Sequence, residues 1–304
     1  MSKKHILTKK QRNIITGYSF IGIWIIGFVI FSLYPLFESF HYSLNNIVQT
    51  TNGLQFTSMG FKHYINIFTA DPDFLLALSS YVIKTLIYVP IIIVFSLMIS
   101  ILLNQKIKFR GFFRSIFFLP VIIVSGPILS ELIKEGSSTV SLINKLGLAE
   151  AVYQYLPSFL ANPIASLLNE FILILWFSGV QIVLFLSVLQ KINTEMYNAA
   201  KIDGANAWET FWKITLPSVK GIIIVNVIYT TTMISTIATE DNIKLGDKAK
   251  TPLGIIKESM FKTDIARGGF GYTSAMAWVY FLVVILTLGI LLGLFTLVTR
   301  EKKD

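Results

Sequence analysis

The sequence predicts an all-α integral membrane protein with six transmembrane helices and both termini in the cytoplasm. Of the 304 residues, 54% are hydrophobic and 14% are charged, which is too few charges for the surface of a soluble protein. Cysteine is absent, and His5, His41 and His63 all lie outside the long apolar runs. These observations exclude disulfides and thiolate sites, so we expect no catalytic site, no metal and no cofactor.

The charge-free apolar runs have the length of helical spans. A helix needs about 20 mostly apolar residues to cross roughly 30 Å of hydrocarbon. None of the runs alternates with a period of two, as a barrel strand would. The third run contains Pro120, Gly126 and Pro127, so its helix should extend past Glu131 or be irregular near its middle. One transmembrane domain, 1–304, is expected, with spans at 14–37, 80–104, 112–134, 168–190, 218–239 and 273–299.

The distribution of basic residues predicts the orientation. With the N-terminus inside, the inner segments carry 16 basic and five acidic residues, and the outer loops carry nine basic and eleven acidic residues. Lys and Arg are retained on the cytoplasmic side of membranes. The net charge of +9 beside so much apolar sequence suits a lipid bilayer, and not a nucleic acid.

Two ionisable residues lie near the ends of expected spans. Lys84 falls a few residues into the second span and can extend its ammonium to the outer interface. Glu170 begins the fourth span, where the positive end of the helix dipole stabilises a carboxylate. Neither position is typical of a proton-transport site.

Residues 191–217 are too apolar for a solvated linker and too interrupted for a span. The pattern of 195–202 predicts a short helix. Asp203 and Gly204 should end it, because glycine reaches the left-handed C-terminal cap without strain.

A second helix is predicted directly after this stop. Asn206 can cap it together with Glu209, as a variant of the capping box. It should end where Pro217 opens the fifth span. Its predicted aromatic face, at spacings of three and four, consists of Trp208, Phe211, Trp212 and Thr215. From these patterns alone the segment is either an interfacial helix, with tryptophans at headgroup depth, or a docking element for a soluble partner.

The stretch NAAKIDGANAWETFWKITLP, at 198–217, closely resembles the EAA loop of permease subunits of binding-protein-dependent ABC importers, particularly the carbohydrate-uptake group. The similarity covers about the whole chain. GYSFIGIWIIGFVIFSLYPLFESFHYSLNN resembles the family's first span, GFKHYINIF its short outer helix, FRGFFRSIFFLP the entry to its third span and FGYTSAMAWVYFLVV its last. Two features depart from the family: Asn198 replaces the motif glutamate, and 240–265 lacks the usual Gly-Gly-Pro turn.

The resemblance implies a type I ABC importer permease, a transport subunit and not an enzyme, in the plasma membrane of a bacterium. It implies a sugar or oligosaccharide substrate, a second homologous permease, two ATPase subunits and an extracytoplasmic solute-binding protein. ATP hydrolysis would belong to the ATPase subunits, and this sequence contains no G-x-x-x-x-G-K-[ST] phosphate loop. Residues implied in coupling to the ATPase are Asn198, Ala199, Ala200, Asp203, Gly204 and Ala205.

The resemblance also places the solute near the bilayer midplane, between the fourth and fifth spans. Polar and soft apolar side chains in the fifth span recur at helical spacing, which suits the hydroxyls and the C–H face of a sugar. Alternatively, these groups bond to their own helices or hold helices together. The candidates are Trp176, Gly179, Gln181, Asn226, Tyr229, Thr230 and Met233, with Trp176 as a possible platform for a pyranose ring.

A stand-alone secondary carrier or channel for a small polar solute is the alternative function. Ion-coupled carriers usually need acidic residues inside their spans, and the charge-free runs contain none. Internal inverted repeats are not apparent. The outer loops 38–78, 135–164 and 240–267 can carry short helices that dock a binding protein, or they are solvated connections.

Overall fold

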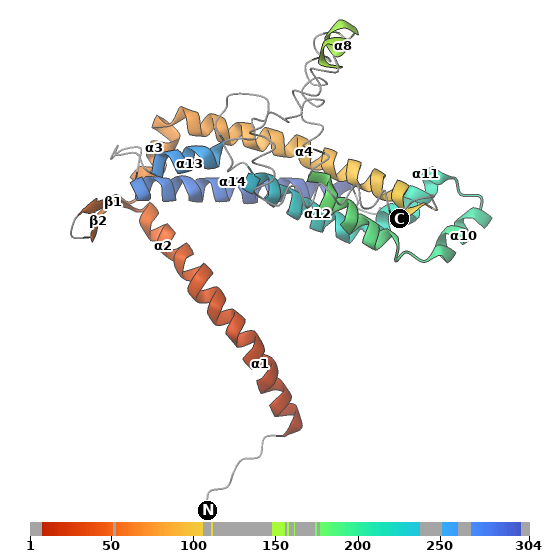
Figure 1. The fold of residues 1–304 in the computed structure, drawn as a ribbon, viewed down its shortest axis with the longest axis horizontal. Helices are drawn as coiled ribbons and strands as arrows, with labels where there is room; N and C mark the ends of the chain where they lie inside the picture. The colour runs from red at the N-terminus through yellow and green to blue at the C-terminus, as the bar shows by residue number, and fades with distance from the viewer. Residues whose placement is uncertain are drawn as a thin grey trace, which may run out of the picture. The chain divides into compact units, whose positions relative to one another are not determined.

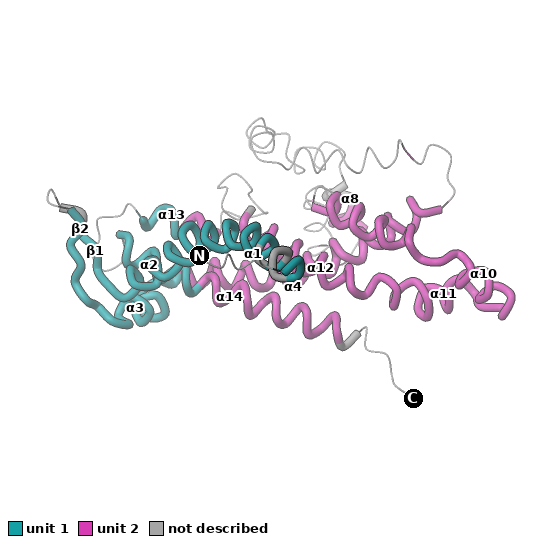
Figure 2. The backbone as a smooth tube through the Cα atoms, turned by 90° about the horizontal axis from the view of Figure 1, so that it is seen from below, with its two compact units in different colours: residues 1–72, 256–279 teal, residues 73–255, 280–304 magenta. Residues whose placement is uncertain are grey.

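A computed structural model describes residues 8–50, 53–105, 111, 148–155, 157, 161, 174, 177–237, 251–260 and 269–298. The described part is mostly α-helical (Figure 1). It separates into two compact units (Figure 2), one made of residues 1–72 and 256–279 and one made of residues 73–255 and 280–304. The two units are described separately below.

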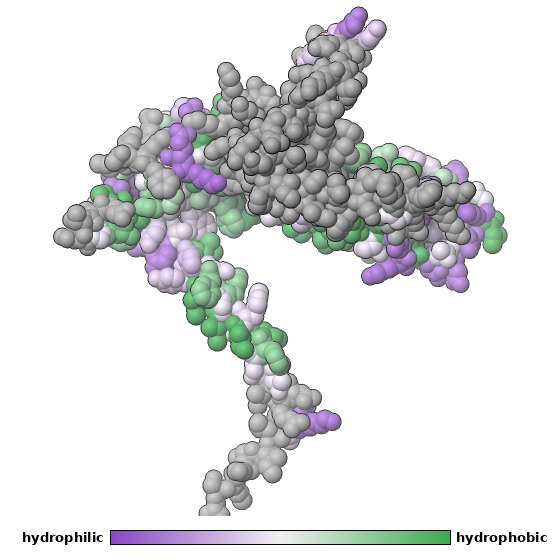
Figure 3. Space-filling model, in the orientation of Figure 1, coloured by the Kyte–Doolittle hydropathy of each residue, from purple (hydrophilic) through white to green (hydrophobic). Residues whose placement is uncertain are grey.

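The first unit begins with one long helix. α1 (Lys9–Phe28), the π-helical turn η1 (Val29–Leu33) and α2 (Tyr34–Ser43) follow one another without a break. The Tyr34 N–H donates to the Val29 carbonyl, which widens the turn just before Pro35. Proline lacks an N–H and crowds the preceding turn, so a wide turn lets the helix continue. Hydrophobic residues, in green, recur along the coloured part of this helix (Figure 3). The helix continues past the expected end at residue 37.

An antiparallel hairpin follows this helix and was not expected. β1 (Asn45–Thr50) pairs with β2 (Gly53–Ser58), and Ile47 lies opposite Phe56. The sequence Thr-Asn-Gly at 51–53 is typical of a hairpin turn. α3 (Lys62–Ala70) comes next, at the position of the expected short outer helix.

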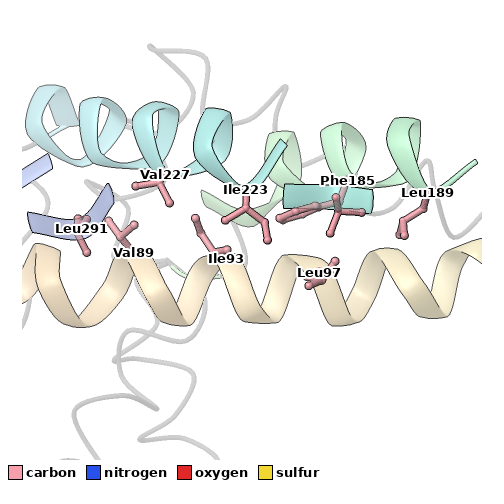
Figure 4. Packing of buried hydrophobic residues seen from close by; sticks show 9 residues of the cluster. Val89, Ile93, Leu97, Phe185, Leu189, Ile223, Val227 and Leu291 are labelled. Atoms are coloured by element: carbon pink, nitrogen blue, oxygen red, sulfur yellow. The ribbon is translucent and has the colours of Figure 1, made fainter. Parts of the chain in front are cut away.

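The second unit is a bundle of apolar helices: α4 (Pro72–Asn104), the helix Phe177–Leu189, α12 (Leu216–Ile237) and the part of α14 (Gly269–Val298) that starts at Tyr280. Figure 4 shows Val89 and Ile93 of α4 pointing toward Ile223 and Val227 of α12. Phe185, Leu189, Leu97, Val219 and Leu291 complete this core. Burial of such side chains contributes about 1.5–3 kcal/mol each in water, whereas in lipid the gain comes from close packing.

Short helices α8 (Leu148–Tyr155), α10 (Thr194–Ile202), α11 (Ala207–Thr210) and α13 (Pro252–Met260) lie between the long ones. Within the described residues, four helices are long and apolar enough to span a bilayer: Thr16–Ser43, Pro72–Asn104, Ala207–Thr236 and Gly269–Thr296. The apolar helix Phe177–Leu189 lies in the expected fourth span. The expected third span, at 112–134, lies outside the described residues.

Candidate functional site

The loop between Phe177–Leu189 and α12 begins with a capped helix. The Asn193 side chain accepts a hydrogen bond from the Glu195 N–H at 3.0 Å, so α10 starts at Thr194, within one residue of the prediction. Asn193 Nδ2 also donates to Glu195 Oε2 at 3.1 Å. These two bonds fix the direction in which α10 leaves the membrane helix.

α10 ends in a Schellman motif, as the glycine predicted. Gly204 has φ +78°, the left-handed region. The Ala205 N–H donates to the Ala200 carbonyl at 2.9 Å, and the Gly204 N–H donates to the Lys201 carbonyl at 3.2 Å. This pair of bonds defines the motif and reverses the chain within three residues.

The next helix starts with the predicted capping box. Asn206 Oδ1 accepts from the Glu209 N–H at 2.9 Å, and Glu209 Oε2 accepts from the Asn206 N–H at 3.0 Å. Both ends of the turn between α10 and α11 are therefore held by local hydrogen bonds. This geometry presents α10 as a defined element and not as a loose linker.

The predicted end of this second helix at Pro217 is wrong. α11, the π-helical turn η2 (Phe211–Thr215) and α12 form one helix, and Pro217 lies inside it. The Leu216 N–H bonds to the Phe211 carbonyl five residues back, so the turn before Pro217 is widened, as it is before Pro35. The widened turn also changes which residues share one face of the helix. Trp208 and Thr215 were predicted to lie on the same face, but Trp208 is 69% exposed while Thr215 is buried.

Large apolar side chains project from the loop. Ile202 is 86% exposed, and Met196, Trp208 and Trp212 are also exposed. Trp208 and Trp212 contact each other edge-to-face with ring centroids 5.5 Å apart. The residues implied in coupling lie between these side chains: Asn198, Ala199, Asp203 and Gly204 are exposed, and Ala200 and Ala205 are half-buried. Sequence reasoning missed Ile202, although an isoleucine directly before Asp-Gly was the available signal.

One hydrogen bond ties α10 back to the helix that follows. The Tyr197 hydroxyl lies 3.1 Å from Thr215 Oγ1, which belongs to η2. Phe211 and Leu216, on either side of this threonine, pack against the core of the second unit. The loop is thus connected to the packed interior at η2, where it meets α12.

The predicted pathway residues are brought together in part. Gln181 Nε2 donates to Thr230 Oγ1 at 2.8 Å, and that hydroxyl donates to the Asn226 carbonyl at 2.7 Å. Gln181, Thr230 and Asn226 are all completely buried. Neither polar atom of the Asn226 side chain, nor Gln181 Oε1, has a partner among the described residues.

The other pathway candidates differ in exposure. Tyr229 is 37% exposed. Met233 packs with Ile92 and Phe177, and Gly179 is buried. Trp176 lies outside the described residues.

Sequence reasoning missed a second buried polar contact. The rings of Tyr81 and Tyr280 meet edge-to-face with centroids 5.2 Å apart, and the Tyr280 hydroxyl donates to the Ser235 carbonyl at 2.9 Å. This contact joins α4, α12 and α14 inside the second unit. The hydroxyl pair Tyr81 and Thr85, one turn apart in an expected span, was the available signal.

A buried histidine organises the outer part of the first unit. His63 Nε2 lies 3.3 Å from the Asn45 carbonyl oxygen, and Nδ1 has no partner among the described residues. Burial lowers the pKa of His63, and the Asn45 contact opposes this effect. A Cβ at Gly271 would overlap the same carbonyl, so only glycine lets α14 approach β1.

The probable ABC transporter permease protein YesP of Bacillus subtilis is 31% identical over 291 residues, covering 91% of this chain and 90% of that protein. The chain belongs to the ABC transporter permease family. The lactose transport system permease protein LacF of Rhizobium radiobacter is 31% identical over 74% of this chain and 72% of its own length. The multiple sugar-binding transport system permease protein MsmF of Streptococcus mutans is 32% identical over 69% of this chain and 70% of its own length. No family model matches the chain.

Two solved structures support the same fold. A permease chain from a bacterial ABC transporter involved in alginate import matches 96% of this chain and 99% of its own length, with a TM-score of 0.62 and 18% identity. A chain of the alginate transporter in complex with a pentasaccharide-bound periplasmic protein matches with a TM-score of 0.61 and 17% identity, over 96% and 98% of the two lengths. This ABC permease is therefore a multi-pass membrane protein and a transport subunit, not an enzyme, as the resemblance implied.

Proposed function

We propose that this permease forms half of the translocation pathway of a bacterial ABC importer for a sugar or oligosaccharide. The observation that supports this function best is the loop from α10 to α11, which contains two capped helices, the second of which continues directly into the helix of the expected fifth span. Arabinooligosaccharide, lactose and multiple-sugar names among the relatives support a carbohydrate as cargo.

The partners would be a second homologous permease, two ATPase subunits and a solute-binding protein. The alginate transporter was solved with a periplasmic protein bound, which supports delivery by such a protein. The exposed apolar side chains of the loop support a protein partner on that side, because exposed apolar patches mark interaction sites.

The membrane arrangement we propose has six spans, both termini in the cytoplasm, and the bacterial plasma membrane as its location. The four long apolar helices and Phe177–Leu189 support five of the spans. The basic residues of the 191–220 segment support its cytoplasmic side.

Coupling would pass through Asn198, Ala199, Ala200, Asp203, Gly204 and Ala205. Gly204, Ala199 and Ala200 leave little side-chain bulk, so an ATPase subunit can approach the backbone closely. Asn198 is exposed and uncharged; it can hydrogen-bond an ATPase side chain but cannot form the salt bridge that a glutamate would.

The solute would pass beside Gly179, Gln181, Asn226, Tyr229, Thr230 and Met233, with Trp176 as the ring platform. Tyr229 is the best placed, since its exposed ring can meet a ligand between two permeases. Asn226 is supported by its side-chain amide, which has no partner among the described residues, because a buried amide without partners costs several kcal/mol. Each hydrogen bond to a sugar would add about 0.5–1.5 kcal/mol, which gives weak binding suited to release.

Reconstitution tests this function. The tagged permease, purified with its bound subunits, is placed in liposomes with purified solute-binding protein outside and ATP on the ATPase side. We expect ATP-dependent uptake of at least one radiolabelled carbohydrate from a panel of lactose, arabino-oligosaccharides and alginate oligomers. Equal uptake by the permease alone, without ATPase subunits, would instead establish a stand-alone carrier.

A further inference from the structure

Among the described residues, α10 has few attachments to the helices beside it. None of its residues is buried. Residues 191–237 are all described, and within them a single side-chain hydrogen bond joins α10 to the helix 207–237, the one between Tyr197 and Thr215. Within residues 191–237, a force applied to α10 therefore reaches the membrane helix through the turn at Gly204 or through this bond.

The receiving residue, Thr215, lies at a special point of that helix. It is the last residue of η2, it is 7% exposed, and its Oγ1 also lies 3.5 Å from the Thr210 carbonyl. Two residues later Pro217 interrupts the normal hydrogen-bond ladder. A widened turn beside a proline is where helices bend most readily.

The two sides of this turn have different surroundings. Val219 and Ile223, on the membrane side, belong to the packed core. Trp208, on the loop side, is mostly exposed. Bending at η2 would therefore move the loop and α12 relative to each other, and a contact that stiffens this joint, beside the packing of Phe211 and Leu216, would help the loop transmit force.

We propose that Tyr197 is a positioning residue whose hydrogen bond to Thr215 latches α10 to the joint at η2 and passes the motion of α10 to the fifth span. The inference rests on the proposed function, since the motion comes from the ATPase subunits. The bond attaches the middle of α10, and the Gly204 turn attaches its end. A force on the helix therefore acts on η2 and not on the Gly204 turn alone.

A spectroscopic test uses the lack of native cysteine. Spin labels at Lys201→Cys on α10 and Val225→Cys on α12, both exposed positions, report the distance between the two helices in the full-length permease in nanodiscs. The parent should give one narrow distribution. Tyr197→Phe should raise the fraction of detached, broadly distributed α10 by about two- to tenfold, the effect of losing one hydrogen bond.

The matched control is Thr210→Val, which also loses a hydroxyl bond but one internal to the second helix, to the Asn206 carbonyl. It should leave the distribution narrow. Tyr197→Phe combined with Thr215→Val should broaden it no further than Tyr197→Phe alone, because both changes break the same bond. An unchanged distribution in Tyr197→Phe overturns the latch.

A coupling readout separates positioning from mere stabilisation. In the reconstituted complex, Tyr197→Phe should lower the number of carbohydrate molecules imported per ATP at least twofold, with the amount of bound ATPase unchanged. An unchanged ratio beside a broadened distribution overturns the positioning role. A parent complex without ATP-dependent uptake overturns the proposed function and its coupling role together, whereas a normal parent with a normal Tyr197→Phe overturns the latch alone.

Discussion

Replacement of Gly204 tests which of two reasons requires a glycine in the loop: the left-handed conformation of the turn, or contact of an ATPase subunit with the backbone. Its φ of +78° is unfavourable for other residues, yet a Cβ added there would meet no atom of the chain within 4 Å. Gly204→Ala therefore costs only the left-handed strain, about 1–2 kcal/mol, which lowers the population of the native turn by about 5- to 30-fold. Gly204→Asn should cost less, because asparagine tolerates this region, and Gly204→Val should cost more.

The assay compares ATP-dependent uptake and the amount of ATPase bound for the three variants, after equal membrane insertion has been verified by size-exclusion chromatography. If the turn conformation is what matters, uptake should decrease from Asn to Ala to Val. If an ATPase subunit contacts the backbone at this position, all three should fail, including Asn. Parental uptake by Gly204→Val would refute both explanations.

Three further substitutions test the loop and the outer part of the first unit. Ile202→Asp should weaken ATPase binding by about 30-fold, since burying an isoleucine is worth about 2 kcal/mol, and should leave the melting temperature unchanged because this side chain is 86% exposed; equal binding would remove Ile202 from the interface. Gly271→Ala should lower the melting temperature or abolish insertion, because the methyl group would overlap the Asn45 carbonyl, with Gly289→Ala, which has open space, as the control. Burial lowers the pKa of His63 below its ordinary value of 6.5, so on acidification the unfolded chain binds the proton first. The free energy of unfolding should therefore fall as the pH drops below about 6.5. His63→Asn should remove this pH dependence between pH 8 and pH 5, and the same pH dependence in both proteins would exclude the histidine as its source.

The loop between Phe177–Leu189 and α12 was the most predictable part of the fold. Its helix ends depend on side chains two or three residues from the groups they cap, so Asn206 with Glu209, and Gly204, could be recognised directly. The position of Pro217 inside a continuous helix could not be predicted, because proline at a helix start and proline after a widened turn have the same local sequence. Packing of Phe211 and Leu216 against the core favours the continuous helix.

The outer part of the first unit was beyond sequence reasoning for a different reason. Asn45, His63 and Gly271 come from three separate segments, and the need for glycine appears only when α14 meets β1. The pairing of Gln181 with Thr230 likewise joins residues 49 positions apart. Sequence reasoning named both residues as pathway candidates but gave no means of pairing them.

Asn226 differs from the buried serines of the second unit in its hydrogen bonding. Ser96 and Ser100 are buried in α4, and each bonds a carbonyl one turn back, so the fold alone accounts for them. Asn226 is as deeply buried, but its amide atoms bond nothing in the described part of the chain. Leucine there would fill a similar volume without the cost of a dry amide. A buried amide that no described residue satisfies, one turn from the Gln181–Thr230 bond, is therefore a stronger pathway candidate than the polar residues whose hydrogen bonds are complete.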